Sequence, residues 1–97
     1  MDTTRLGEVF TDIQDEFFES CNKHDKVFNT THEGYAVLKE ELEELWDDIK
    51  KDNWNNIYDE AAQVGAMAMK LMYSLPEIVK KYEKKGHTKN GKQLRIK

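Results

Sequence analysis

Residues 35–51 read YAVLKEELEELWDDIKK, and this stretch decides the fold. Its apolar residues recur at intervals of three and four, the spacing that lines up one face of an α-helix. They are Tyr35, Leu38, Leu42, Leu45, Trp46 and Ile49. Thr30 stands three residues before Glu33, the spacing of a capping box. The stretch therefore predicts an amphipathic helix that begins near His32 and continues to about Lys51.

Acidic residues border the apolar stripe on both sides. At about 100° per residue, one trio falls beside the predicted core and a second trio falls on the other flank. The first trio is Glu41, Glu44 and Asp48, and the second is Glu40, Glu43 and Asp47. An exposed helix can be acidic simply to stay soluble. However, Glu41 and Glu44 lie where the core meets water, which can aim two carboxylates into a shared cleft.

The same periodicity predicts three further helices. They span residues 3–26, residues 56–73 and residues 75–85, with short connections at 27–31 and 52–55. Ser74 and Pro76 mark the break before the last helix, because proline is favoured at an early helical position. The predicted fold is all-α, an antiparallel bundle of about four helices. We expect one helical domain over residues 1–85 and a basic tail over residues 86–97.

Length and charge limit the partners of this chain. Ninety-seven residues form one domain with a modest core, so we expect completion by oligomerisation, as a homodimer or homotetramer. Residues 1–83 carry 9 basic and 19 acidic side chains, a balance of −10, whereas residues 84–97 carry 6 basic side chains and no acid. An acidic body disfavours a broad nucleic-acid surface, although the tail alone can touch phosphate.

The sequence also predicts a cellular location. The single cysteine, Cys21, cannot form an internal disulfide, which favours a reducing environment. The N-terminal residues MDTTRLGEVFTDIQDE are acidic and polar, unlike a signal peptide, and no apolar run approaches the length that crosses a bilayer. We therefore expect a soluble, cytoplasmic protein that does not enter a membrane.

The predicted second and third helices carry matching oxygen pairs. Glu60 and Gln63 lie at the same offset from their apolar stripe as Glu41 and Glu44 do from theirs. A short loop would make the two helices antiparallel neighbours, so that these four side chains converge in one crevice.

Several other kinds of catalytic site do not fit the sequence. Its glycines are scattered, so it has no glycine-rich phosphate loop, and it has no G-x-S-x-G elbow. The histidines His24, His32 and His87 follow no zinc-ligand spacing, and no Glu-x-x-His pair suggests a di-iron bundle. Ligation by oxygen alone remains, and this selects hard cations such as Mg²⁺ or Mn²⁺.

These residues resemble a known family. LKEELEEL at residues 38–45, followed by DEAAQV at residues 59–64, is similar to the E-E-x-x-E and E-x-x-D motifs of MazG-type, all-α nucleoside triphosphate pyrophosphohydrolases. The resemblance spans roughly residues 5–75. It implies Mg²⁺-dependent cleavage of a nucleoside triphosphate between its α and β phosphates, with release of a monophosphate and pyrophosphate. It also implies a dimer or tetramer of helical subunits.

The resemblance assigns roles residue by residue. Glu41, Glu44 and Glu60 match the metal-binding acids, and Gln63 stands where the family usually has Asp. An amide supplies a neutral carbonyl oxygen in place of a charged carboxylate, which weakens the attraction for Mg²⁺. Glu40 matches the first acid of the motif and is the predicted general base, although its wheel position is equally compatible with exposure.

Substrate contacts are predicted for four further residues, each with a simpler structural interpretation. Phe17, His32 and Trp46 are predicted to border a base pocket, but such residues are more often core, turn or capping positions. Lys39, like Lys23, Lys26 and Lys70, can contact phosphate, although most lysines are solvated. The competing hypothesis is a non-catalytic helical oligomer or binding module whose metal site is degraded, as Gln63 would signal.

Overall fold

The computed structural model describes residues 1–84, which form three α-helices. They are α1 (Thr3–Lys23), α2 (Thr31–Lys50) and α3 (Trp54–Lys84), and residues 1–84 contain no β-strand. The all-helical class is thus confirmed. The predicted tail at 86–97 and the last residue of the predicted domain, at 85, lie outside this range.

The third and fourth predicted helices are one helix. The expected break at Ser74 and Pro76 is wrong, because α3 continues through both residues. Proline removes one backbone hydrogen bond, here to the carbonyl of Met72, and this residue lies on the solvent side with 75% of its surface exposed. Continuation also buries Ile78 in the core, where it is 2% exposed. Water on one face and apolar burial on the other therefore offset the cost of the proline.

Side-chain caps fix the beginnings of α1 and α2. The carboxylate of Asp2 accepts a hydrogen bond from the Arg5 N–H at 3.0 Å. The Thr30 hydroxyl accepts one from the Glu33 N–H at 3.0 Å, while the Glu33 carboxylate accepts one from the Asn29 N–H at 2.8 Å. The predicted cap at Thr30 is confirmed, with the reciprocal bond displaced by one residue.

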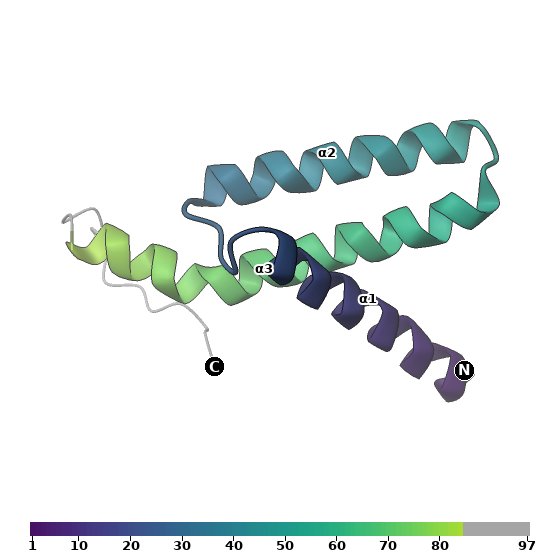
Figure 1. Cartoon of the computed structure of the whole chain (residues 1–97), viewed down its shortest axis with the longest axis horizontal. Coiled ribbons are helices and arrows are strands. Elements are labelled where there is room, and N and C mark those ends of the chain that lie inside the picture. The colour runs from purple at the N-terminus through teal and green to yellow at the C-terminus, as the bar shows by residue number, and fades with distance from the viewer. Residues whose placement is uncertain (85–97) are drawn as a thin grey trace.

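The long helix α3 is the centre of the fold (Figure 1). Both α1 and α2 pack against α3, whereas α1 and α2 make no close backbone contact with each other. A tight turn joins α2 to α3, with Asp52 in the left-handed region at φ 54°. Because this connection is short, α2 and α3 lie side by side and antiparallel, as the sequence predicted.

The core forms where the α1–α2 connection lies against α3. Phe28 from this connection is 4% exposed and packs with Ala66, Met67 and Ile78 of α3. Partly buried residues surround this cluster: Ile13, Phe17, Val37, Leu38 and Leu71. The core is small, so the positions of α1 and α2 depend on few residues.

Most of the apolar stripe of α2 remains at the surface. Leu38 and Leu45 are half-buried against the chain, but four other stripe residues are 42% to 64% exposed. These are Tyr35, Leu42, Trp46 and Ile49, here called the outer apolar face of α2. Within residues 1–84, α3 is the only helix that packs against α2, so a narrow strip of α2 is buried, and Gly34, Val37 and Glu41 occupy part of that strip.

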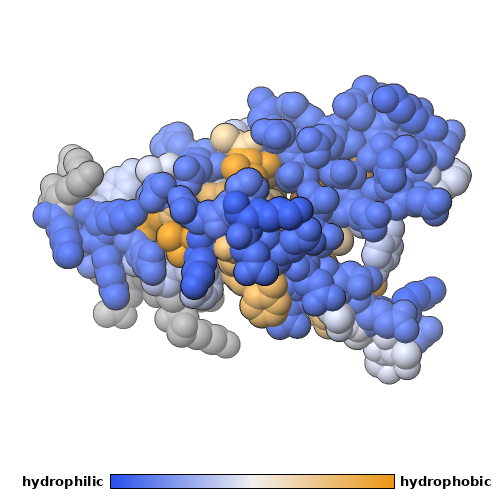
Figure 2. All heavy atoms as spheres, viewed as in Figure 1, coloured by the Kyte–Doolittle hydropathy of each residue, from blue (hydrophilic) through white to orange (hydrophobic). Residues whose placement is uncertain are grey.

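The surface seen in Figure 2 is largely hydrophilic, with apolar atoms showing between the helices near the middle of the molecule. Within residues 1–84, no helix is both long enough and apolar enough to span a membrane.

Candidate metal centre

Three carboxylates meet where α2 faces α3. Glu41 and Glu44 lie one helical turn apart on α2, and Glu60 lies in the first half of α3. One carboxylate oxygen from each residue lies within 4.8 Å of the others. The antiparallel pairing of α2 and α3 produces this convergence, because it brings equivalent wheel positions of both helices to one seam.

The cluster is electrostatically strained without a cation. Burial, and then the charges of Glu44 and Glu60, raise the pKa of Glu41 from 4.5 to about 7. Burial and the charge of Glu44 also raise the pKa of Glu60. The Oε2 atoms of Glu41 and Glu60 are both buried and accept no hydrogen bond from any residue in the described range. Two buried acceptors of this cluster therefore lack a donor.

A bound proton or cation reduces the repulsion between these carboxylates. Carboxylate oxygens are ligands of hard divalent ions such as Mg²⁺ and Mn²⁺, and three carboxylates provide three negative charges at one point. The donor set of Glu41, Glu44 and Glu60 therefore fits such an ion.

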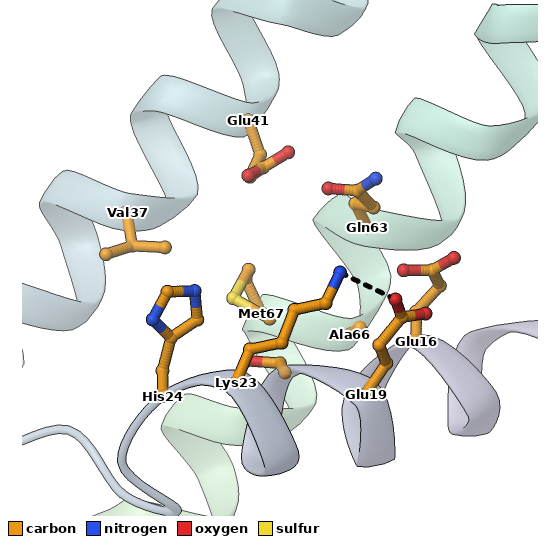
Figure 3. Close-up of a pocket in the computed structure, with 10 residues that line it drawn as sticks. Glu16, Glu19, Lys23, His24, Val37, Glu41, Gln63, Ala66 and Met67 are labelled. Atoms are coloured by element: carbon orange, nitrogen blue, oxygen red, sulfur yellow. Dashed lines mark ion pairs between the residues drawn. The ribbon is translucent and has the colours of Figure 1, made fainter.

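A cleft of about 310 Å³ opens beside the cluster (Figure 3). Glu41 projects into it from α2, and Gln63 projects toward Glu41 from α3. The opposite wall comes from α1, where Lys23 pairs with Glu19 at 2.7 Å. Gln63 thus lines the same cleft as Glu41.

The contribution of α1 to this cleft was not predicted from the sequence. Its wall is formed by Glu16, Glu19, Ser20 and Lys23, with His24 just beyond the helix. Burial and the nearby charge of Glu19 raise the pKa of Glu16. The spacing of three and four between these polar residues is a signal for a shared face, but the sequence gives no indication that this face lies opposite Glu41.

A second cavity of about 350 Å³ adjoins the first and reaches the core. Both cavities are lined by Ser20, His24, Val37, Glu41 and Met67. The second cavity also contains Lys70 and Glu40. Lys70 is 3% exposed, in contrast to the solvated lysine that the sequence suggested.

The other predicted site residues are dispersed. Glu40 is exposed and lies on the rim of the second cavity. Phe17 packs against the core and meets Tyr73 edge to face, with ring centroids 5.8 Å apart. His32 and Trp46 are exposed on α2, and Lys39 is paired with Glu43 at 3.9 Å. None of these last four lines either cavity, so their contacts with substrate stay predictions.

The chain was also compared with known proteins. No model of a protein family matches it. No curated protein matches it, and no solved structure does either.

Proposed function

We propose that the chain is a Mg²⁺-dependent nucleotide pyrophosphohydrolase of the MazG-like, all-α type. The observation that supports this proposal is the convergence of Glu41, Glu44 and Glu60 within 4.8 Å. The buried, unpartnered oxygens of Glu41 and Glu60 add to it, because such oxygens need a positive partner.

Three carboxylates and one amide would hold the ion. Glu41, Glu44 and Glu60 supply the charge, and Gln63 is the fourth proposed ligand through its neutral carbonyl oxygen. Bound Mg²⁺, or Mn²⁺ in its place, polarises phosphate oxygens and lowers the pKa of water. Loss of one charge at Gln63 predicts weaker metal binding than four carboxylates would give.

The remaining residues have to orient a nucleoside triphosphate and a water molecule. Hydrolysis between the α and β phosphates gives a monophosphate and pyrophosphate, and a general base accepts the proton of the attacking water. Glu40 is the proposed base, since it directly precedes Glu41 in the sequence and lines the second cavity. Base recognition by Phe17, His32 and Trp46, and phosphate contact by Lys39, are part of this proposal.

The proposed assembly is a homodimer or homotetramer. The outer apolar face of α2 has no cover in the described chain, and α1, which contains no fully buried residue, exposes Phe10 to 63%. A second copy of the chain is the proposed cover, because two such faces exclude water from each other and complete the bundle. The proposed setting of this assembly is the cytoplasm.

A metal titration and a product assay together test the function. Purified chain with Mg²⁺ is expected to release pyrophosphate from at least one common ribonucleotide or deoxyribonucleotide. Glu41→Gln is expected to abolish both metal binding and pyrophosphate release without loss of stability. Absence of pyrophosphate release from every common nucleotide would reject the hydrolase.

The alternative is a non-catalytic helical oligomer. The neutral Gln63 beside Glu41 favours this reading, because it leaves the oxygen cluster one charge short. A chain of this kind would bind neither Mg²⁺ nor Mn²⁺, and Glu41→Gln would leave its assembly unchanged. Nucleic acid is not a proposed partner, given the acidic body of the protein.

A further inference from the structure

Within the described residues, Lys70 is a buried cation without a carboxylate partner. It is 3% exposed, and its ammonium donates one hydrogen bond, to the Ser20 hydroxyl at 3.1 Å. It also lies 5.1 Å from the centroid of the Phe28 ring. No carboxylate in residues 1–84 forms an ion pair with it. An ammonium has three N–H donors, so two of them have no protein acceptor in this range.

This ammonium borders the space that the acidic cluster also borders. The second cavity, about 350 Å³, is lined by Lys70 and by Glu41, and Glu41 belongs to the cluster. A volume of this size is sufficient for a small polar ligand. A ligand in the cavity can therefore contact both Lys70 and Glu41.

The charges around the cavity define what this ligand is. Its lining includes the carboxylates of Asp25, Glu33, Glu40 and Glu41, which repel a free anion. An anion that carries its own divalent cation complements both kinds of charge, because the acidic cluster attracts the cation and Lys70 attracts the anion. Phosphate groups are common partners of a lysine ammonium.

We infer that Lys70 is the anchor for a phosphate group of a metal-bound pyrophosphate or longer polyphosphate chain, an inference that rests on the proposed function. Lys70 holds the end of the chain remote from the reacting phosphorus, which places it with the leaving pyrophosphate. The Ser20 hydroxyl orients the ammonium from α1, so α1 positions the anchor although it supplies none of the metal ligands.

The stability of a Lys70 variant distinguishes a ligand anchor from a lysine with a purely structural role. Lys70→Met keeps the length and apolar stem of the side chain over Phe28 but removes a buried charge that lacks a counter-ion. Replacement of such a charge by an apolar group of similar volume is neutral or stabilising. A lysine that serves mainly to join α1 to α3 would instead be needed for stability.

The experiment uses the full chain and isothermal titration calorimetry. Mg²⁺ is titrated first, and inorganic pyrophosphate is then titrated at saturating Mg²⁺. We expect Lys70→Met to leave the affinity for Mg²⁺ unchanged and to weaken pyrophosphate binding by about tenfold or more. Lys80→Met is the control, since Lys80 is an exposed lysine of the same helix, α3, and lines neither cavity. Its affinity for pyrophosphate is expected to equal that of the wild type.

A second variant keeps the test decisive if Lys70→Met does not fold. Ser20→Asp places a carboxylate beside the ammonium and supplies the missing counter-ion, so we expect a higher melting temperature and weaker pyrophosphate binding. A higher melting temperature with unchanged pyrophosphate affinity overturns the inference. The same holds if Lys70→Met folds and binds pyrophosphate as tightly as the wild type, or if the wild type binds no pyrophosphate. Pyrophosphate binding that depends on Lys70, together with no release of pyrophosphate from any common nucleotide, supports the anchor and rejects the hydrolase.

Discussion

The hydroxyl of Ser74 accepts a hydrogen bond from the backbone N–H of Phe28 at 2.8 Å, across 46 residues of sequence. Ser74 is completely buried and donates its own proton to the Lys70 carbonyl at 2.7 Å. This bond fixes the α1–α2 connection to α3 at the residue that forms the centre of the core. A polar side chain in a helix thus determines where Phe28 is held.

Ser74→Ala is expected to destabilise the protein by about 1–3 kcal/mol, because it leaves the buried Phe28 N–H without an acceptor. Thr11→Ala is the control, since the Thr11 hydroxyl bonds the Gly7 carbonyl in the same local manner but at the surface. Its effect is expected within about 0.5 kcal/mol. Chemical denaturation measures both, and equal stability of the two variants would contradict the role given to Ser74.

Glycine-to-alanine substitutions at Gly34 and Gly7 are expected to have opposite effects on the stability of the protein. A Cβ at Gly34 would lie 2.8 Å from Leu71 Cδ1 and 3.1 Å from Phe28 Cδ2, and the buried Phe28 ring cannot withdraw. Overpacking costs about 1–3 kcal/mol, which outweighs the helix-propensity gain of about 1 kcal/mol.

Gly7 has open space, with no atom within 4 Å of the added Cβ. Gly7→Ala is therefore expected to stabilise the protein by about 0.5–1 kcal/mol. Thermal unfolding of the two variants, compared with the wild type, measures whether each substitution stabilises or destabilises the protein. A stabilised Gly34→Ala would show that α2 can move away from the core.

Stability without metal is expected to depend on the ionisation of Glu41. Its pKa is about 7 in the folded chain against an ordinary value of 4.5, so the folded state binds more protons between these values. The free energy of unfolding therefore falls as pH rises through this window. Glu41→Gln removes this contribution, so its stability relative to the wild type should rise from pH 4.5 to pH 7 and then level off.

Thermal unfolding in a chelator, at a series of pH values, measures the difference between Glu41→Gln and the wild type. Addition of Mg²⁺ at neutral pH is expected to raise the melting temperature of the wild type and not that of the variant. Glu43→Gln is the control on the exposed flank of α2. A difference between Glu41→Gln and the wild type that does not change with pH would exclude a strained carboxylate.

A fourth carboxylate at position 63 is expected to strengthen metal binding. Gln63→Glu keeps the size of the side chain that projects toward Glu41 and adds one negative charge. We expect about tenfold tighter binding of Mn²⁺ by calorimetry. The same variant should be less stable than the wild type in a chelator, because the carboxylates then repel one another. Unchanged affinity would place Gln63 outside the ligand set.

Self-association is expected to depend on the outer apolar face of α2. Trp46 is 56% exposed and Leu42 is 54% exposed, so Leu42→Lys with Trp46→Lys should shift an oligomer toward monomer while each chain stays helical. Sedimentation velocity measures the shift, and circular dichroism checks the helices. Lys39→Glu with Glu43→Lys, which reverses a surface pair on the same helix, should leave the assembly intact. A wild-type chain that is monomeric at all concentrations would contradict the proposal.

Much of the helical fold was predictable because its signals are local. Apolar spacing located the helices, and the Thr30 cap gave the beginning of α2 to within one residue. The short loop at Asp52 made the antiparallel pair of α2 and α3 predictable, and with it the meeting of Glu41, Glu44 and Glu60. Each of these inferences depends on positions that are close in sequence.

The incorrect predictions concern features that depend on contacts between residues distant in sequence. Local proline chemistry predicted a break at Pro76, but the burial of Ile78 against Phe28 keeps α3 continuous. The apolar stripe of α2 suggested a covered face, whereas four of its six residues are exposed. Periodicity shows which side chains share a face but not how much of that face a neighbour covers.

The sequence by itself determined that the chain forms amphipathic helices and that Glu41, Glu44 and Glu60 lie at matching positions beside the apolar stripes of two of them, because helical periodicity and capping act over a few residues. The tertiary structure decided that Lys70 is buried beside Ser20 and that α1 forms a wall of the cleft. These features depend on the angle at which α1 crosses α3, and that angle follows from side-chain packing between segments about 50 residues apart.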